Sequence, residues 1–439
     1  MTQAGKTFSP SRRSLLTGGA AAIGGASLAQ AATEPVQNPA AAPESVTTAQ
    51  RQPFHGSHQS GIVTPRPATG MVAAFDVTAT SLDELERLFR LLNERIAFLM
   101  QGGPAPTADP GFPPPDSGIL GPVIAPDNLT VTVALGASLF DERFGLGPLK
   151  PKHLQRMKRF RNDALDGAIC HGDLLLQFCA NTADTGIHAL RDILKNAPDL
   201  LLLRWKQEGT VPALKPKQGE PAESARNLLG FRDGTANPDA ADKALMDRLV
   251  WVRPGSGEPE WAAEGSYQVV RIIRNFVERW DRTPLGEQEA IMGREKASGA
   301  PFGGRREYDE PVYADDPEGK RTKLDAHIRL ANPRRPETEG SRMLRRPFNY
   351  SNGVTRAGQL DMGLLFICFQ QDLERSFIAV QKRLDGEPLE EYIKPVGGGY
   401  FFALPGVPDA GRYLGDGLIQ AARGIVPAAA STSPRKTGD

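Results

Sequence analysis

Two similar apolar segments recur in the two halves of this 439-residue chain. Gly172-Asp-Leu-Leu-Leu-Gln-Phe-Cys179 stands in the first half and Gly363-Leu-Leu-Phe-Ile-Cys-Phe-Gln370 in the second, and an amphipathic pattern follows each of them. A short apolar run predicts a buried strand, and the pattern after it predicts a helix. The repetition therefore predicts an internal duplication, which restricts the chain to folds built from two similar units.

Further patterns in each half fit the same unit. The first half has strand patterns at residues 71–77, 129–135 and 174–179, a capping box at Ser81-Leu-Asp-Glu84 that opens a helix, and a second helix through 187–194. The second half has strand patterns at 268–273 and 364–369, a helix entered through Thr283-Pro284, and an amphipathic helix through 373–384. We therefore predict an α+β fold of duplicated ferredoxin-like modules, each an antiparallel sheet with helices, arranged within one chain like a dimeric α+β barrel.

The N-terminal segment is typical of an export signal. Lys6 and the pair Arg12-Arg13 precede a Gly/Ala-rich apolar run, which ends at the small-residue site Ala29-Gln30-Ala31. An arginine pair directly before such a run is typical of the twin-arginine route, which exports proteins that have already folded. We predict a periplasmic protein without stable membrane insertion, because no other stretch has the roughly 18 apolar residues of a membrane span.

These patterns divide the chain into five segments. We predict a signal peptide at 1–31, a flexible leader at 32–60, an N-terminal ferredoxin-like half at 61–225, a C-terminal ferredoxin-like half at 226–427 and a flexible tail at 428–439.

Composition and missing motifs exclude several function classes. The 52 basic and 52 acidic residues cancel, so the charge gives no reason to expect nucleic acid as a partner. Phosphate-binding loops, HExxH zinc motifs and GxSxG nucleophile motifs are absent from the sequence. Three cysteines without tight spacing, Cys170, Cys179 and Cys368, support neither a disulfide framework nor a zinc site, and we expect them in the core.

Two segments have residues that could carry chemistry. His327 stands in a region rich in Lys and Arg, which suits an anionic cofactor, and Asp233 lies between Gly230 and Gly234 in a loop. Taken singly, a lone histidine beside apolar residues is more often a core residue, and Asp-Gly is more often a simple turn. Context alone therefore leaves both alternatives open.

The segments together resemble the dye-decolourising peroxidase family. The motifs are Gly230-x-x-Asp233-Gly234, Gly293-Arg294, His327, Arg345 eighteen residues after it, Gly363-Leu-Leu-Phe-Ile-Cys-Phe-Gln370 and Gly397-Gly-Gly-Tyr-Phe-Phe402, in this order, and the match covers most of the chain after the signal. With a twin-arginine signal, the chain is most similar to the exported deferrochelatase/peroxidase subgroup linked to iron uptake. It departs from the family at Pro347, where members often have glycine after the arginine pair.

The resemblance implies one heme b per chain, held between the halves and chiefly against the C-terminal one. It implies His327 as the proximal iron ligand. It further implies cofactor contacts from Gly234, Thr235, Ala236, Arg294, Asn332, Pro333, Arg334, Arg345, Leu364 and Phe366. The other ring nitrogen of His327 should donate a hydrogen bond to a carboxylate or carbonyl, and the sequence does not say which residue accepts it.

In this family the reaction is the reduction of hydrogen peroxide while organic donors or ferrous iron are oxidised. Cleavage of the O–O bond needs a proton moved between the two oxygens, which suits Asp233, and stabilisation of developing charge, which suits Arg345. An unperturbed aspartate titrates near about 3.9, below histidine, so we expect turnover to be best at acidic pH. Bulky donors would need electron transfer through Trp or Tyr side chains, and the sequence does not say which.

Two alternatives are kept. One is a deferrochelatase, which releases iron from heme and leaves the porphyrin intact; the other is a heme-binding protein without turnover, against which Asp233 and Arg345 both weigh. The natural donor, a link to iron-uptake proteins and a homodimer stay open.

Overall fold

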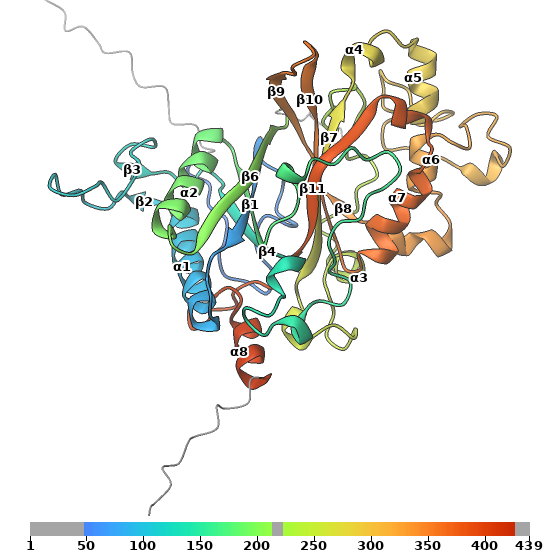
Figure 1. Ribbon diagram of the computed structural model, residues 1–439. Helices are drawn as coiled ribbons and strands as arrows, with labels where there is room; N and C mark the ends of the chain where they lie inside the picture. Colours follow the sequence, from blue (N-terminus) through green and yellow to red (C-terminus); the bar gives the residue numbers. More distant parts are fainter. Residues whose placement is uncertain (1–47, 213–222, 426–439) are drawn as a thin grey trace, which may run out of the picture. The chain divides into compact units, whose positions relative to one another are not determined.

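The structure, a computed structural model, describes residues 48–212 and 223–425 (Figure 1). The predicted signal peptide, leader residues 32–47 and the predicted tail lie outside the described residues.

The first half is one ferredoxin-like unit. Its four strands form an antiparallel sheet in the order β4-β5-β1-β6, and two helices connect them. The elements in chain order are β1 (Thr69–Val77), α1 (Leu82–Gln101), β4 (Thr130–Gly136), β5 (Leu174–Ala180), α2 (Ala183–Asn196) and β6 (Leu201–Thr210). A long arm between α1 and β4 includes the two-residue strands β2 (Gly103–Pro104) and β3 (Val123–Ile124).

The second half repeats this unit with long insertions. Its sheet has the order β11-β7-β10-β9, so β5 and β10 occupy equivalent places, as the two similar segments predict. The strands are β7 (Ser266–Asn275), β9 (Phe348–Val354), β10 (Leu360–Gln370) and β11 (Ile393–Ala403), with the short β8 (Leu344–Arg345) also paired to β10. The helices are α3 (Lys243–Leu249), α4 (Val277–Trp280), α5 (Leu285–Met292), α6 (His327–Ala331), a π-helical turn (Glu374–Ile378) that continues into α7 (Ala379–Leu384), and α8 (Asp416–Ile425).

The two sheets join into a closed barrel, which confirms the predicted duplicated α+β fold. β4 pairs with β11, β6 pairs with β9, and β7 and β10 pair within the second half, so the ring of eight strands has no free edge. Side chains alternate between the two faces: Val72 and Ala74 point into the barrel core, whereas Ala73 and Phe75 pack outward against the helices.

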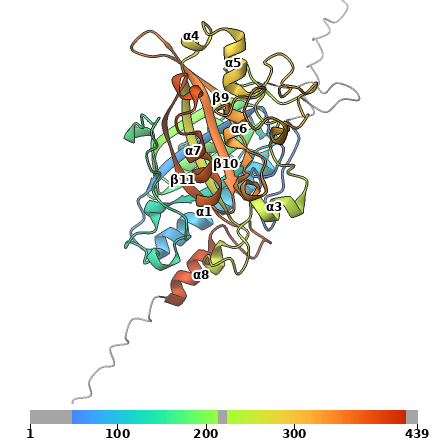
Figure 2. The ribbon, with the colours of Figure 1, turned by 90° about the vertical axis from the view of Figure 1, so that its right-hand side faces the viewer.

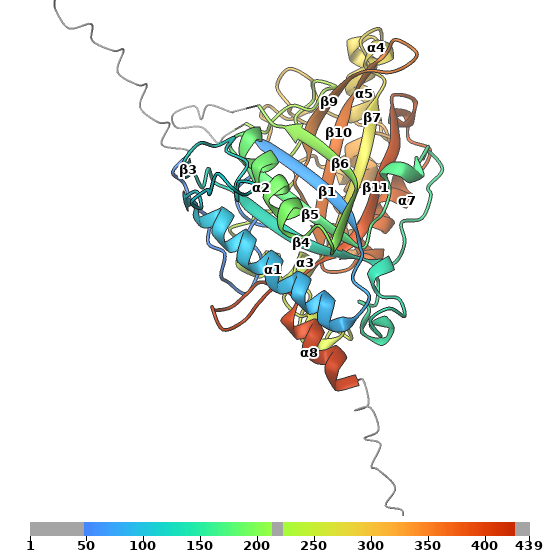
Figure 3. The same ribbon diagram turned by 60° about the vertical axis from the view of Figure 1, so that its left-hand side comes forward.

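Helices cover the outside of each half. α1 begins after Ser81, whose hydroxyl accepts from the Glu84 N–H at 3.2 Å, and its buried face packs with α2 over the first sheet (Figure 3). On the second half, α6 and α7 lie over β10 and β11 (Figure 2). The long insertion between β7 and β9 supplies α6, and this places His327 above the sheet.

The predicted leader extends too far. Residues 48–60 pack on the barrel: His55 forms a bridge with Val407, and the buried Gln59 side chain bonds Val133 and Leu404. The prediction of a flexible segment is therefore wrong for these residues, because it relied on weak apolar periodicity and could not see backbone pairing.

All three cysteines are buried and free. Within the described ranges, none of the helices has both the length and the apolar character needed to cross a membrane.

Candidate active site

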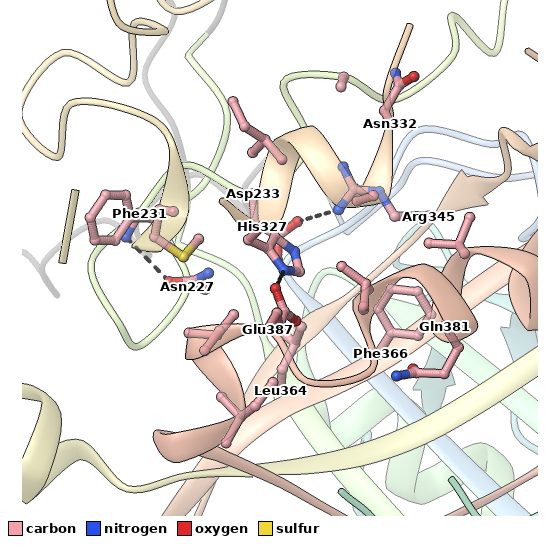
Figure 4. A pocket seen from close by; sticks show the side chains of 18 of the residues that line it. Asn227, Phe231, Asp233, His327, Asn332, Arg345, Leu364, Phe366, Gln381 and Glu387 are labelled. Atoms are coloured by element: carbon pink, nitrogen blue, oxygen red, sulfur yellow. Dashed lines mark hydrogen bonds and ion pairs between the residues drawn. The ribbon is translucent and has the colours of Figure 1, made fainter. Parts of the chain in front are cut away.

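A cavity lies on the outer face of the second sheet, between β7 and β10 on one side and α6 and α7 on the other. Most of its lining comes from these elements, from the loop that contains Asp233 and from the insertion that precedes α6 (Figure 4). Separate stretches of the C-terminal half therefore meet at one site.

His327 is the first residue of α6 and faces the cavity. Its Nδ1 lies 2.8 Å from Oε2 of Glu387, a buried carboxylate that precedes the short helical turn Pro388–Glu391. With a carboxylate as acceptor, Nδ1 donates, and Nε2 on the other side of the ring stays available as a ligand. Burial lowers the pKa of His327, but the charge and hydrogen bond of Glu387 outweigh this effect and place the pKa above its ordinary value.

Asp233 and Arg345 form an ion pair within the same cavity. The Arg345 Nη1 donates to Asp233 Oδ1 at 2.8 Å, and both side chains keep part of their surface open to the cavity, 28% for Arg345 and 13% for Asp233. A guanidinium beside a carboxylate provides a positive charge and a proton carrier at one place. Arg346 turns the other way and donates to the Thr64 carbonyl, so only the first arginine of the pair reaches the cavity.

Backbone contacts fix this pair. Asn237 bonds the backbone of Arg345 twice, accepting from its N–H at 2.8 Å and donating to its carbonyl at 3.0 Å. The Asp233 N–H donates to the Ala225 carbonyl, and Gly234 takes φ +135°, a conformation that side chains rarely allow. These contacts hold the loop that contains Asp233 beside β8, where Asp233 can reach Arg345.

The cavity has an apolar part and a basic part. Leu364 and Phe366 from β10 form an apolar floor. At the other end stand the buried Arg294, which donates to the carbonyls of Gly299 and Glu307, and Arg334, which pairs with Glu310 at 3.0 Å. Burial lowers the pKa of Arg294 because water hardly reaches its charge, and an anion beside it would stabilise the charged guanidinium.

These residues fit a heme. Across the residues that the structure describes, no group of three or more His, Cys, Asp or Glu side chains could hold a metal ion. His327 offers one nitrogen ligand, which is what a heme iron takes from a proximal histidine. Tyr313 and Arg342 line the cavity, and the phenol oxygen of Tyr313 and the Nε of Arg342 are buried without a hydrogen-bond partner among the described residues. A flat apolar ring with two carboxylates would cover the floor and engage the basic end.

The structure brings nearly all predicted site residues together. Lining the cavity are Asp233, Gly234, Thr235, Ala236, Arg294, His327, Asn332, Arg334, Arg345, Leu364 and Phe366. Pro333 stands between two lining residues without lining the cavity itself. Sequence reasoning missed Glu387 and Tyr313 and attached no role to Asn237; Glu387 is sixty residues from its partner, and no local pattern marks it.

Comparisons with known proteins agree with this geometry. Residues 59–210 match the family described as Dyp-type peroxidase, N-terminal, and residues 224–408 match Dyp-type peroxidase, C-terminal. The chain is 59% identical over 413 residues to a deferrochelatase of Escherichia coli O157:H7, with 94% of this chain and 97% of the relative covered. It is 58% identical over 421 residues to a deferrochelatase of Yersinia pseudotuberculosis, with 95% and 96% covered.

Solved structures give the same fold. A DyP-type peroxidase from Cellulomonas bogoriensis aligns with a TM-score of 0.76 at 35% identity, covering 85% of this chain and 99% of that one. Ferric DtpA from Streptomyces lividans aligns with a TM-score of 0.76 at 35% identity, covering 87% and 100%.

Proposed function

Because this chain belongs to the Dyp-type peroxidase family and is a heme peroxidase, we propose that His327 holds the iron while Asp233 and Arg345 act on peroxide. The observation that carries the proposal is the arrangement of the cavity. His327 is backed by Glu387 at 2.8 Å, and the Asp233–Arg345 pair opens into the same space.

Bound heme supplies the redox chemistry that splits peroxide. The protein's own residues prepare for it: Glu387 keeps the His327 ring oriented and makes it a stronger donor. Asp233 takes the proton from one peroxide oxygen and returns it to the leaving oxygen. Arg345 stabilises the negative charge that develops on the leaving oxygen and holds Asp233 in place.

The first test is the visible spectrum of the heme-loaded protein before and after one equivalent of hydrogen peroxide. We expect His327→Ala to lose specific heme binding, and Asp233→Ala to bind heme and react slowly. If the visible spectrum of the wild-type protein does not change after peroxide is added, the proposed roles of Asp233 and Arg345 are contradicted.

Iron release from heme is a second candidate, because the relatives from Escherichia coli and Yersinia are named deferrochelatases. In that reaction the iron leaves and two protons take its place on the ring nitrogens. Fluorescent metal-free porphyrin after incubation with heme supports this activity, and intact heme after the same incubation speaks against it.

We also propose export to the periplasm through the twin-arginine route. The support is the order of Arg12-Arg13, the apolar run and Ala29-Gln30-Ala31. Organic compounds and ferrous iron are the proposed electron donors.

A further inference from the structure

Aromatic side chains form a row that leads from the cavity into the protein. Phe366 lines the cavity, and its ring centroid lies 6.1 Å from that of Phe377. Phe377 lies 5.8 Å from Tyr400. Tyr400 and Phe402 are two residues apart on the same face of β11, which separates their Cα atoms by roughly 7 Å.

The row ends at a tyrosine and a tryptophan. Phe402 lies edge-on to Tyr267 at 5.1 Å and to Trp261 at 5.5 Å. Tyr267 is the second residue of β7 and points to the same outward face as Arg271 and Ile273, which line the cavity further along the strand. One strand and one row of rings thus connect Tyr267 with the site.

Tyr267 has a proton acceptor in place. A phenol that gives up an electron becomes a strong acid, so it is oxidised easily only where its proton has somewhere to go. The Tyr267 side chain is fully buried, and its hydroxyl donates to Oε1 of Glu258 at 2.6 Å while it accepts from the His153 N–H at 2.9 Å. Burial and the Glu258 charge raise the pKa of Tyr267, so the resting phenol keeps its proton.

Several other tyrosines lack this arrangement. Tyr313 lines the cavity, but its buried hydroxyl has no hydrogen-bond partner among the described residues. The Tyr400 hydroxyl is buried without a partner among the described residues, so an oxidised Tyr400 could not lose its proton. Tyr392 reaches the cavity side through Trp280 and Phe231, but its hydroxyl accepts a hydrogen bond from the Thr283 hydroxyl at 3.1 Å, and a hydroxyl is a poor base. Tyr413 does bond a carboxylate, Glu86, but its ring packs against Arg90.

We propose that Tyr267 is a redox-active residue that holds one oxidising equivalent outside the cavity, with Glu258 as the acceptor of its proton. One electron leaves the Tyr267 ring and passes along the row to the cavity, where peroxide supplies the oxidant. The O–H proton crosses the 2.6 Å hydrogen bond to Oε1 of Glu258, and a neutral tyrosyl radical remains. Glu258 is only half-buried, and its Oε2 accepts from the Lys152 N–H at 2.7 Å, so the proton can pass on to water. The inference rests on the proposed function.

The test is electron paramagnetic resonance on heme-loaded protein frozen at intervals after one equivalent of peroxide. We expect a radical signal whose hyperfine pattern narrows when the protein contains ring-deuterated tyrosine. Tyr267→Phe keeps the ring packing and should lose this signal. In Glu258→Gln the amide oxygen can still accept the hydrogen bond from Tyr267 but cannot take up its proton. This variant should therefore form the radical roughly 10²-fold more slowly.

Tyr392→Phe is the matched control, because it removes a buried hydroxyl without a carboxylate partner; its signal should equal that of the wild type. A tyrosyl signal that survives in Tyr267→Phe, or a wild-type signal unaffected by deuterated tyrosine, overturns the inference. The visible spectrum separates the two proposals: if peroxide changes it and no Tyr267 radical appears, only the inference fails. If peroxide leaves it unchanged, the proposed function fails.

Discussion

Asp233 is the side chain whose removal should slow the reaction most without loss of heme. Asp233→Asn keeps the size of the side chain and a hydrogen bond with Arg345 but cannot move a proton. We expect the rate constant with peroxide to fall by about 10²- to 10⁴-fold, measured by stopped-flow absorbance. Asp239→Asn, an exposed residue of the same loop, should leave the rate unchanged. Equal rates for both variants and the wild type would show that another group carries the proton.

Glu387 should control how firmly the protein holds its cofactor. Glu387→Gln removes the charge behind His327 and leaves the 2.8 Å contact to a neutral amide. We expect heme to transfer to apomyoglobin about 10 to 100 times faster, because partners of a metal-binding histidine contribute this much to affinity. Glu391→Gln, exposed at the end of the same turn, is the control. Unchanged transfer in Glu387→Gln would mean that the histidine is oriented by packing alone.

His171 should make the fold sensitive to acid. Burial, with the charges of Arg156 and Arg204, lowers its pKa from 6.5 to about 4, so the unfolded chain takes up a proton before the folded one does. Its contribution to stability is present above pH 6.5 and is lost as pH falls towards 4, by about 1 to 2 kcal/mol at pH 5.

The check for His171 is urea unfolding at pH 7 and pH 5. His171 has φ +61°, which asparagine tolerates, so His171→Asn should fold and should show a smaller difference between the two pH values. The same difference in variant and wild type would assign the acid sensitivity to other groups.

At the scale of elements, the arm between α1 and β4 is anchored to α2 by a buried pair and by Lys195, which donates to the Pro114 carbonyl. His188 on α2 lies 2.6 Å from Asp116, and the arm carries the exposed Phe112. Breaking a buried pair by removing one partner leaves an uncompensated polar group, so Asp116→Ala should release the arm without unfolding the barrel. We expect cleavage within residues 105–122 by a nonspecific protease to become at least about tenfold faster. Asp109→Ala, which removes only a local bond to Gly111, should not change it; equal cleavage of both variants would contradict the anchoring role.

An element could be predicted from the sequence where a local pattern of residues determines its conformation, and could not where long-range backbone pairing does. β5 is buried on both faces, whereas β10 buries one face and lines the cavity with the other; both are visible in the sequence as apolar runs. α1 is visible from its cap and its apolar stripe. β6 alternates exposed charged residues with buried ones and β11 contains three consecutive glycines, so neither was predicted as a strand. β6 and β11 adopt the strand conformation because their backbones pair with β1 and β7, and this long-range pairing leaves no local pattern in the sequence.

The residues of the candidate site also fall into those that the sequence predicts and those that it does not. Asp233, His327 and Arg345 stand in motifs and could be named, whereas Glu387 and Asn237 act through contacts made only when the insertion and β8 fold onto the sheet. Long-range hydrogen bonds of this kind have no signature in one sequence. The roles of all five residues stay predictions until the variants are measured.

At the scale of the whole molecule, the barrel closes only through strands from distant parts of the chain. β4 pairs with β11, and β6 pairs with β9 at a single position, so the first half cannot complete its sheet edges until the second half exists. Pairings between such distant segments form late, because the loop that they close is long. A chain of this kind is best exported after folding, which is what the proposed twin-arginine route would do.

Replacing the arginine pair should therefore keep the protein inside the cytoplasm. The double variant Arg12→Lys with Arg13→Lys retains the charge of the segment but removes the pair that the export machinery reads. We expect cell fractionation to find the protein in the cytoplasm, folded and able to bind heme, while Lys6→Arg is exported like the wild type. A chain that ends before β11 should fail to leave the cytoplasm even with its signal intact, because its barrel stays open. Export of the double variant at the wild-type level would contradict the proposed route, and export of the shortened chain would break the link between barrel closure and export.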